Sequence, residues 1–181
     1  MPFIKLYNFK PQIGEHINFI FTEHKDDYLC CKLTDYDLDC IMTFQCLTSK
    51  KKIKSLKSLA PLNKEMIGII ENIDYDNIEL NLININKNSE DYHNFIQLNQ
   101  NNNFLKKYLN QFTHKYDKNL NTLLENCIYT LNDNSNSNSN SNSNSNSNSN
   151  YNYLNQILES KLENDFYNFV KNNLKSNDIK S

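Results

Sequence analysis

Arginine and tryptophan are absent from this sequence, and all nineteen basic residues are lysines. Ala60 is the only alanine, and Gly14 and Gly68 are the only glycines. We interpret this composition, with its heavy use of Asn, Ile, Lys and Tyr, as codon bias from an AT-rich genome. Lysine supplies a point charge without the bidentate fork of arginine. The net charge of -2 creates no global attraction toward nucleic acid or an anionic membrane, so any such attraction must be local.

Cysteine pairs with metal or redox spacing are also missing. The five cysteines are odd in number, none form a Cys-x-x-Cys pair, and Cys30 and Cys31 are adjacent. This pattern favours reduced thiols in an intracellular protein. No apolar run approaches the roughly 18 residues of a membrane span, and the first residues lack the apolar region of a signal peptide. We therefore expect a cytoplasmic protein with no membrane partner.

Motifs of the common enzyme classes are missing as well. The sequence has no glycine-rich phosphate loop, no nucleophile elbow and no recognisable acid–base pair. The four histidines (His16, His24, His93 and His114) have no metal-ligand spacing, so we place them on the surface. We expect neither an enzyme nor a bound cofactor or metal.

Short-period alternation between Gly14 and Leu82 predicts five strands. Their cores are residues 17–21, 29–33, 40–44, 66–73 and 78–82, separated by polar turns such as 74–77. Five short strands in about 70 residues are typical of a small closed barrel of the OB-fold class. We assign this β barrel to residues 1–86, with a long connection, residues 45–64, between its third and fourth strands.

After Ser89, which is placed to cap a helix, the period becomes helical. Apolar residues then recur at helical spacing in three stretches, 92–112, 120–131 and 154–174. Eight Ser-Asn units, residues 135–150, interrupt the pattern and cannot bury apolar surface, so we expect a disordered surface loop there. The sequence thus predicts an all-α domain at 87–175, closed by one helix from Leu154 to Leu174, and a polar tail at 176–181.

The connection at 45–64 carries the most informative motif, Thr48-Ser49-Lys50-Lys51-Lys52-Ile53-Lys54-Ser55. It resembles the regulatory loop of the alpha subunit of eukaryotic translation initiation factor 2, with lysines where that family has arginines. Ser49 falls where the family has its phosphorylated serine, and Thr48 is the acceptor if the register shifts by one residue. The basic loop residues Lys50, Lys51, Lys52, Lys54 and Lys57 would then contact a kinase or RNA.

Flanking segments agree with this resemblance over residues 3–175. Residues 5–7, 33–42, 77–81, 89–91 and 154–174 are similar to family segments in the same order. Residues Tyr75, Asp76, Asn77, Ile78 and Glu79 stand where the family has a kinase-docking motif, here shorter and without its glycine. The chain ends where the family's third domain, which contacts the gamma subunit, would begin. We therefore expect a truncated homologue without a stable gamma-subunit complex.

The same lysines allow two other interpretations. A charge run is most often a solvated surface, and an OB barrel can bind RNA through basic loops and stacking aromatics. Phe19, Phe21, Tyr28 and Phe44 could stack on bases, although aromatics that alternate on strands more often form a core. Five lysine–phosphate contacts would give a salt slope of about -3.5.

The resemblance implies a role in translation initiation or its control. Our leading hypothesis is a decoy or competing substrate for an alpha-subunit protein kinase such as PKR, as proposed for short alpha-subunit relatives of large DNA viruses; a viral protein would act in the host cytoplasm. The alternatives are a divergent initiation factor that binds ribosome and tRNA, and a generic RNA-binding OB-fold protein. Further partners to consider are RNA, the ribosome and the nucleotide-exchange factor.

Overall fold

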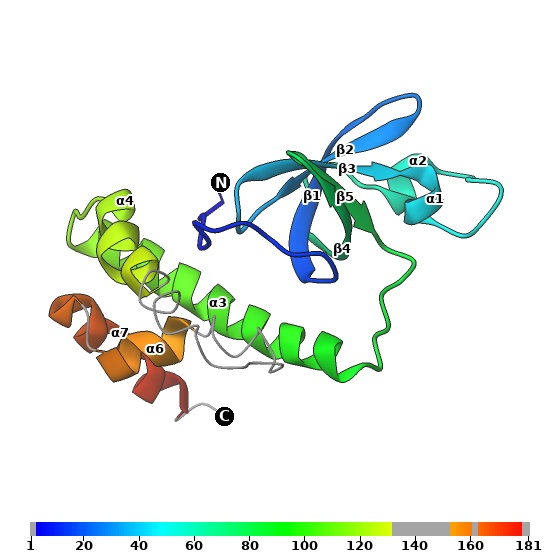
Figure 1. Cartoon of the computed structure of the whole chain (residues 1–181). Helices are drawn as coiled ribbons and strands as arrows, with labels where there is room; N and C mark the ends of the chain where they lie inside the picture. Colours follow the sequence, from blue (N-terminus) through cyan, green and yellow to red (C-terminus); the bar gives the residue numbers. More distant parts are fainter. Residues whose placement is uncertain (1–2, 132–152, 161–162, 179–181) are drawn as a thin grey trace. The chain divides into compact units, whose positions relative to one another are not determined.

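The computed structural model describes residues 3–131, 153–160 and 163–178 of the chain. It divides into two compact units, Met1–Tyr92 and His93–Ser181, which are described separately here (Figure 1). The Ser-Asn repeat at 135–150, for which we expected disorder, lies outside the described residues.

The first unit is a closed five-stranded barrel, as the alternating pattern predicted. Its strands are β1 (His16–His24), β2 (Tyr28–Leu33), β3 (Leu38–Thr43), β4 (Met66–Asp74) and β5 (Asn77–Asn81). They are ordered β1-β2-β3-β5-β4, and β4 pairs with β1 to close the barrel. Every neighbouring pair is antiparallel except β3 and β5. The expected third strand was shifted, because β3 already ends at Thr43 and Phe44 begins a short helix.

Alternate strand residues fill the inside of this barrel. Phe19 and Phe21 on β1 are fully buried and meet edge to face, with ring centroids 5.0 Å apart. Leu29, Met42 and Leu80 from three other strands are fully buried as well. The core interpretation of Phe19 and Phe21 is therefore confirmed, and neither ring is available to stack on a base.

The segment before β1 packs against the barrel through rings and a polar cluster. Tyr7 is buried, donates its backbone N–H to the carbonyl oxygen of Asp35 over 3.0 Å, and its ring centroid lies 4.8 Å from that of Tyr36. The Tyr36 hydroxyl donates to the Glu15 carboxylate. Burial raises the pKa of Glu15 above its ordinary value of 4.5, although the Tyr36 hydrogen bond lowers it in part. The buried amide of Asn18 donates to Asp35 over 3.0 Å.

The second unit is helical. The helices are α3 (Glu90–Lys115), α4 (Leu120–Leu123), the π-helical turn η1 (Leu124–Tyr129), α6 (Tyr153–Ser160) and α7 (Asn164–Asp178). Ser89 caps α3, as predicted: its hydroxyl accepts the backbone N–H of Tyr92 over 3.2 Å. Phe104 belonged to the expected apolar face but is 42% exposed. It lies beside the buried stripe of α3, which passes through Asn102 and Leu105 instead.

The expectation of one helix from Leu154 to Leu174 is wrong. The chain forms two helices, α6 and α7, and Glu163 just before α7 has a left-handed backbone with φ of 51°. A helix cannot continue through that conformation. The apolar pattern alone does not reveal the break, because the apolar residues of both helices recur at helical spacing. Phe166 of α7 is fully buried and contacts Phe112 of α3, with ring centroids 5.3 Å apart.

Candidate functional site

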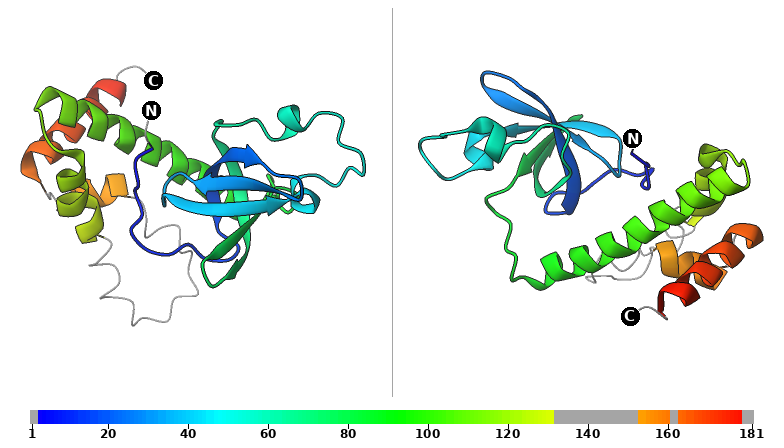
Figure 2. Two further views of the ribbon diagram at one scale, coloured as in Figure 1. Left: turned by 90° about the horizontal axis from the view of Figure 1, so that it is seen from above. Right: turned by 180° about the vertical axis from the view of Figure 1, so that it is seen from behind.

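The long connection between β3 and β4 leaves the barrel as an arch. It contains two single-turn helices, α1 (Phe44–Leu47) and α2 (Leu56–Leu59). We call residues 48–59 the lysine arch. Both views in Figure 2 show the part between α1 and α2 as an extended excursion standing away from the strands.

Both ends of the lysine arch are fixed to the barrel. At the outgoing end Leu47 is buried, and the carbonyl oxygen of Cys46 accepts the backbone N–H of Leu82 over 2.9 Å. At the returning end Ala60 is fully buried, and its carbonyl oxygen lies 2.7 Å from Nε2 of His24. No sequence pattern pointed to this anchor, because His24 and Ala60 are 36 residues apart in the chain.

Ser49 lies in a bend of the lysine arch and is exposed, as predicted. Thr48 is half-buried, its backbone N–H is 3.4 Å from the Phe44 carbonyl oxygen, and its hydroxyl accepts the backbone N–H of Lys50 over 3.2 Å. Ser55 is occupied as the cap of α2, where its hydroxyl accepts from the N–H of Ser58 over 3.3 Å. Of these hydroxyls, that of Ser49 is the most open to a second protein.

The structure brings the predicted basic residues together on one exposed segment. All five are exposed: Lys50, Lys51, Lys52, Lys54 and Lys57. Between residues 40 and 64 the sequence contains no Asp or Glu. Within the described ranges, the ion pairs found join Lys25 to Glu23 and Lys32 to Asp37, outside the arch. The arch therefore presents uncompensated positive charge beside a serine hydroxyl.

The segment expected to dock a kinase forms the hairpin between β4 and β5. Tyr75 is 94% exposed with φ of 51°, and Asp76 and Asn77 are exposed beside it. Ile78 is buried and Glu79 is half-buried on β5. A docking surface at this hairpin would therefore consist of the other residues and not of the Ile78 side chain.

Two aromatic residues remain as stacking candidates on the barrel. Tyr28 is 38% exposed and Phe44 is half-buried. Tyr28 on β2 pairs with Thr43 at the end of β3, and Phe44 follows Thr43 as the first residue of α1. This leaves a smaller aromatic surface than the four residues considered from the sequence.

The structure corrects part of what was predicted for the histidines and describes the surroundings of the cysteines. His93 and His114 are exposed, as predicted, whereas His16 and His24 are half-buried, so the surface placement was wrong for these two. Burial lowers the pKa of His16, and nearby Asp91 partly offsets this.

All five cysteines are free. Cys31 lies opposite Cys40 on β2 and β3, and a hydrogen bond with Cys31 together with burial raises the Cys40 pKa.

Within the described part of the chain, no group of three or more His, Cys, Asp or Glu side chains could hold a metal ion. The helices that the structure describes include none long and apolar enough to cross a membrane.

The chain is similar to solved structures, although no similar sequence was found. No protein-family model matches the chain, and no curated protein is significantly similar to it in sequence. A chain in the crystal structure of an a/eIF2alpha–aDim2p–rRNA complex from Pyrococcus horikoshii OT3 is similar over 92% of this chain and 96% of its own, with a TM-score of 0.57 and 10% identity. The intact alpha subunit of aIF2 from Pyrococcus abyssi is similar over 90% of this chain and 60% of its own, with a TM-score of 0.59 and 12% identity.

This chain therefore spans about three-fifths of the intact archaeal subunit. At these identities the likeness concerns the fold. The closed barrel and the helices of this chain have the fold of an archaeal translation initiation factor 2 alpha subunit over that part of its length.

Proposed function

We propose that this chain is a non-enzymatic, cytoplasmic homologue of the initiation-factor alpha subunit that acts as a competing substrate for alpha-subunit kinases. The observation that carries the proposal is the lysine arch, which holds an exposed Ser49 beside Lys50, Lys51 and Lys52 and is anchored at both ends to a closed barrel. The alpha-subunit fold of the solved neighbours supports it. A kinase that binds this chain is withheld from its normal substrate, so translation initiation continues.

The geometry suits a phosphoryl acceptor. A kinase active site must close around the hydroxyl and the chain on either side of it, which requires an extended, exposed segment. The anchors at Leu47 and Ala60 limit how far this segment can wander from the barrel. Phosphorylation would add a charge of about -1.5 to -2 next to three ammonium groups. The phosphate could then form new charge-assisted contacts that reorder the arch.

A competition assay tests the proposal. An active alpha-subunit kinase such as PKR is incubated with its normal alpha subunit, radiolabelled ATP and increasing amounts of this chain. We expect labelling of this chain and reduced labelling of the subunit, because a competitor present at its dissociation constant occupies half of the kinase that is not bound to the subunit. Ser49→Ala should remove the label from this chain and Thr48→Ala should keep it.

The Ser49→Ala variant also separates the two parts of the mechanism. If docking rests on the barrel and the hairpin at Tyr75, this variant still suppresses labelling of the normal subunit. The proposal fails if the wild-type chain is neither labelled nor able to slow labelling of the subunit at concentrations well above those of the substrate.

RNA binding by the lysine arch is a second candidate, favoured by the five exposed lysines without acidic neighbours in sequence. One of the solved neighbours was crystallised in a complex with rRNA. A divergent initiation factor would use the same surface on the ribosome and tRNA. Co-purification with a gamma subunit would favour that factor role, whereas RNA retention without a kinase or gamma subunit would favour a generic RNA-binding protein.

A further inference from the structure

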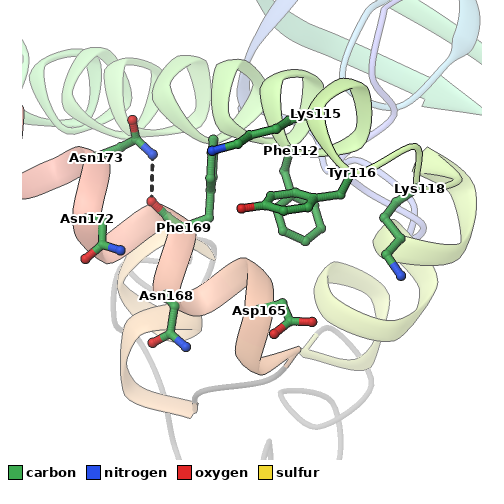
Figure 3. Close-up of a pocket in the computed structure, with 9 residues that line it drawn as sticks. All are labelled: Phe112, Lys115, Tyr116, Lys118, Asp165, Asn168, Phe169, Asn172 and Asn173. Carbon is green, nitrogen blue, oxygen red and sulfur yellow. Dashed lines mark hydrogen bonds between the residues drawn. The ribbon is translucent and has the colours of Figure 1, made fainter.

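The helical unit contains a pocket that none of the functions above uses. It has a volume of about 470 Å³ and lies between the C-terminal end of α3 and helix α7 (Figure 3). This size is within the range of small-ligand pockets. Its lining residues, within the described part of the chain, are three aromatic residues, three asparagines, two lysines and one aspartate.

Three aromatic rings, from both helical segments, contribute to the lining of the pocket. Phe112 is buried beneath it, and the ring of Tyr116 lies 4.9 Å from that of Phe112, measured between centroids. Phe169 of α7 stands almost perpendicular to Tyr116, with centroids 6.4 Å apart. Tyr116 is 49% exposed, so part of its π-surface remains open to a ligand.

The polar lining residues from α7 surround Phe169 in sequence. Asp165, Asn168 and Asn172 follow one another at i, i+3 and i+7 on α7, the spacing of a single helical face. All three are exposed. Asn173 donates its side-chain N–H to the carbonyl oxygen of Phe169 over 2.7 Å, which occupies that amide. The amides of Asn168 and Asn172 offer donors and acceptors to a planar ligand.

Positive charge lies beside the aromatic surface. The Lys115 ammonium is 5.3 Å from the centre of the Tyr116 ring, and exposed Lys118 lines the pocket two residues further on. With Asp165 the three charged side chains leave a net charge of one positive unit. The pocket therefore suits a flat ligand that carries an anionic group.

We propose that this pocket binds one unstacked nucleobase of single-stranded RNA, with the adjoining phosphate held by Lys115 and Lys118. The base stacks on Tyr116, and Asn168 and Asn172 bind its polar edge. Stacking on an aromatic ring, amide contacts to the edge and lysine contacts to phosphate are the usual elements of such recognition. An apolar peptide side chain is a poorer occupant, because its contact with the amides and charged groups that line the pocket would leave those polar groups without hydrogen-bond partners.

The test uses the full chain and two probes, a fluorescent hexa-adenylate followed by anisotropy and AMP followed by ¹⁵N NMR. Tyr116→Leu keeps apolar volume but removes the ring, and it should weaken hexa-adenylate binding about 5- to 150-fold. Tyr116→Phe keeps the ring and should stay within about twofold of the wild type. Lys107→Ala, an exposed lysine on the same helix, is the control for Lys115→Ala.

To remove binding at the lysine arch, the anisotropy series is repeated in a variant in which all five arch lysines (Lys50, Lys51, Lys52, Lys54 and Lys57) are replaced by alanine. AMP should shift the side-chain amide resonances of Asn168 and Asn172, which shows that the pocket takes a free nucleotide as well as a base within a strand. A chain that does not compete for the kinase can still show these shifts, so each of the two proposals can be refuted without the other.

Equal hexa-adenylate affinity of Tyr116→Leu and the wild type in the arch-neutralised chain would overturn the assignment. So would Asn168 and Asn172 resonances that respond to N-acetyl-phenylalanine amide and not to AMP, since that pattern identifies a peptide site. Hexa-adenylate binding that moves these resonances while AMP does not would support the pocket as a site for a base within a strand.

Discussion

The charge of the lysine arch can be tested by removing its first three lysines. In Lys50→Ala/Lys51→Ala/Lys52→Ala the barrel should remain intact, because all three side chains are exposed and none takes part in the ion pairs found within the described residues. Ser49 and both anchors of the arch are unchanged. The variant therefore alters the field around the serine and little else.

The expected effect on RNA binding follows from counterion release. Each lysine that neutralises a phosphate on a single strand contributes about -0.7 to the slope of log K against log salt. Five arch lysines thus contribute about -3.5, and the two that remain, Lys54 and Lys57, contribute about -1.4. Between 50 and 200 mM salt the arch contribution should fall about 130-fold in the wild type and about 7-fold in the variant.

Fluorescence anisotropy with a labelled single-stranded oligouridylate, repeated at several salt concentrations, measures both slopes. The slope should become shallower by about 2.1 in the triple variant, whatever other parts of the chain contribute. Lys25→Ala/Lys32→Ala is the matched control, because both lysines are paired with carboxylates and should leave the slope nearly unchanged. Equal slopes for the wild type and the triple variant would show that RNA does not contact the arch.

Two further predictions concern the barrel that carries the arch. Burial raises the folded-state pKa of Glu15 above 4.5, so the wild type loses stability as pH rises from about 4.5 through the folded-state pKa. Glu15→Gln has no such loss and should therefore be increasingly more stable than the wild type over this pH range. Urea unfolding at pH 4 and 7 checks this, and a difference in stability that does not depend on pH would contradict it. Gly68→Ala should lower the free energy of unfolding by about 1–2 kcal/mol, because the added Cβ would lie 3.0 Å from the fully buried Phe19 ring. The cost of overpacking, about 1–3 kcal/mol, exceeds the stabilisation of about 0.4–1 kcal/mol that comes from the lower entropy of the unfolded chain. A higher melting temperature for Gly68→Ala would contradict the second prediction.

The strands of the barrel could be predicted because each one is indicated by residues that are close together in the sequence. Alternation on residues such as Phe19 and Phe21 reports directly which side chains face a core, and polar clusters mark the turns between strands. Phe44 was misassigned because an apolar residue at the end of a strand looks the same whether the chain continues straight or turns into a helix. The closing pair of β1 and β4 confirms the class of barrel but could not be deduced in register from sequence.

Exposure of Ser49 was also predictable, because a long polar connection cannot be buried without unpaired backbone groups. The anchors were not. His24 and Ala60 are 36 residues apart, and their contact depends on where the arch returns to the barrel. The pocket at Tyr116 is equally nonlocal, because its asparagines and Phe169 come from α7, whereas Phe112 lies in α3 and Tyr116 directly after it. Sequence periodicity placed Phe112 and Phe169 in a core and gave no reason to expect an opening beside them.

The distribution of charge explains how an acidic protein can present a basic functional surface. Residues 40–64 contain six lysines and no acidic residue, so the rest of the chain has thirteen lysines against twenty-one acidic residues, a net charge of -8. The remainder of the chain taken together therefore repels an anionic partner, whereas the segment at 40–64 attracts it. At physiological salt this selectivity acts over about 8 Å, a range that favours encounters at the arch itself. The same arrangement would bring a phosphate backbone or an acidic substrate-binding cleft of a kinase to Ser49, which is why the two functional candidates share one surface and why the triple-lysine variant tests both.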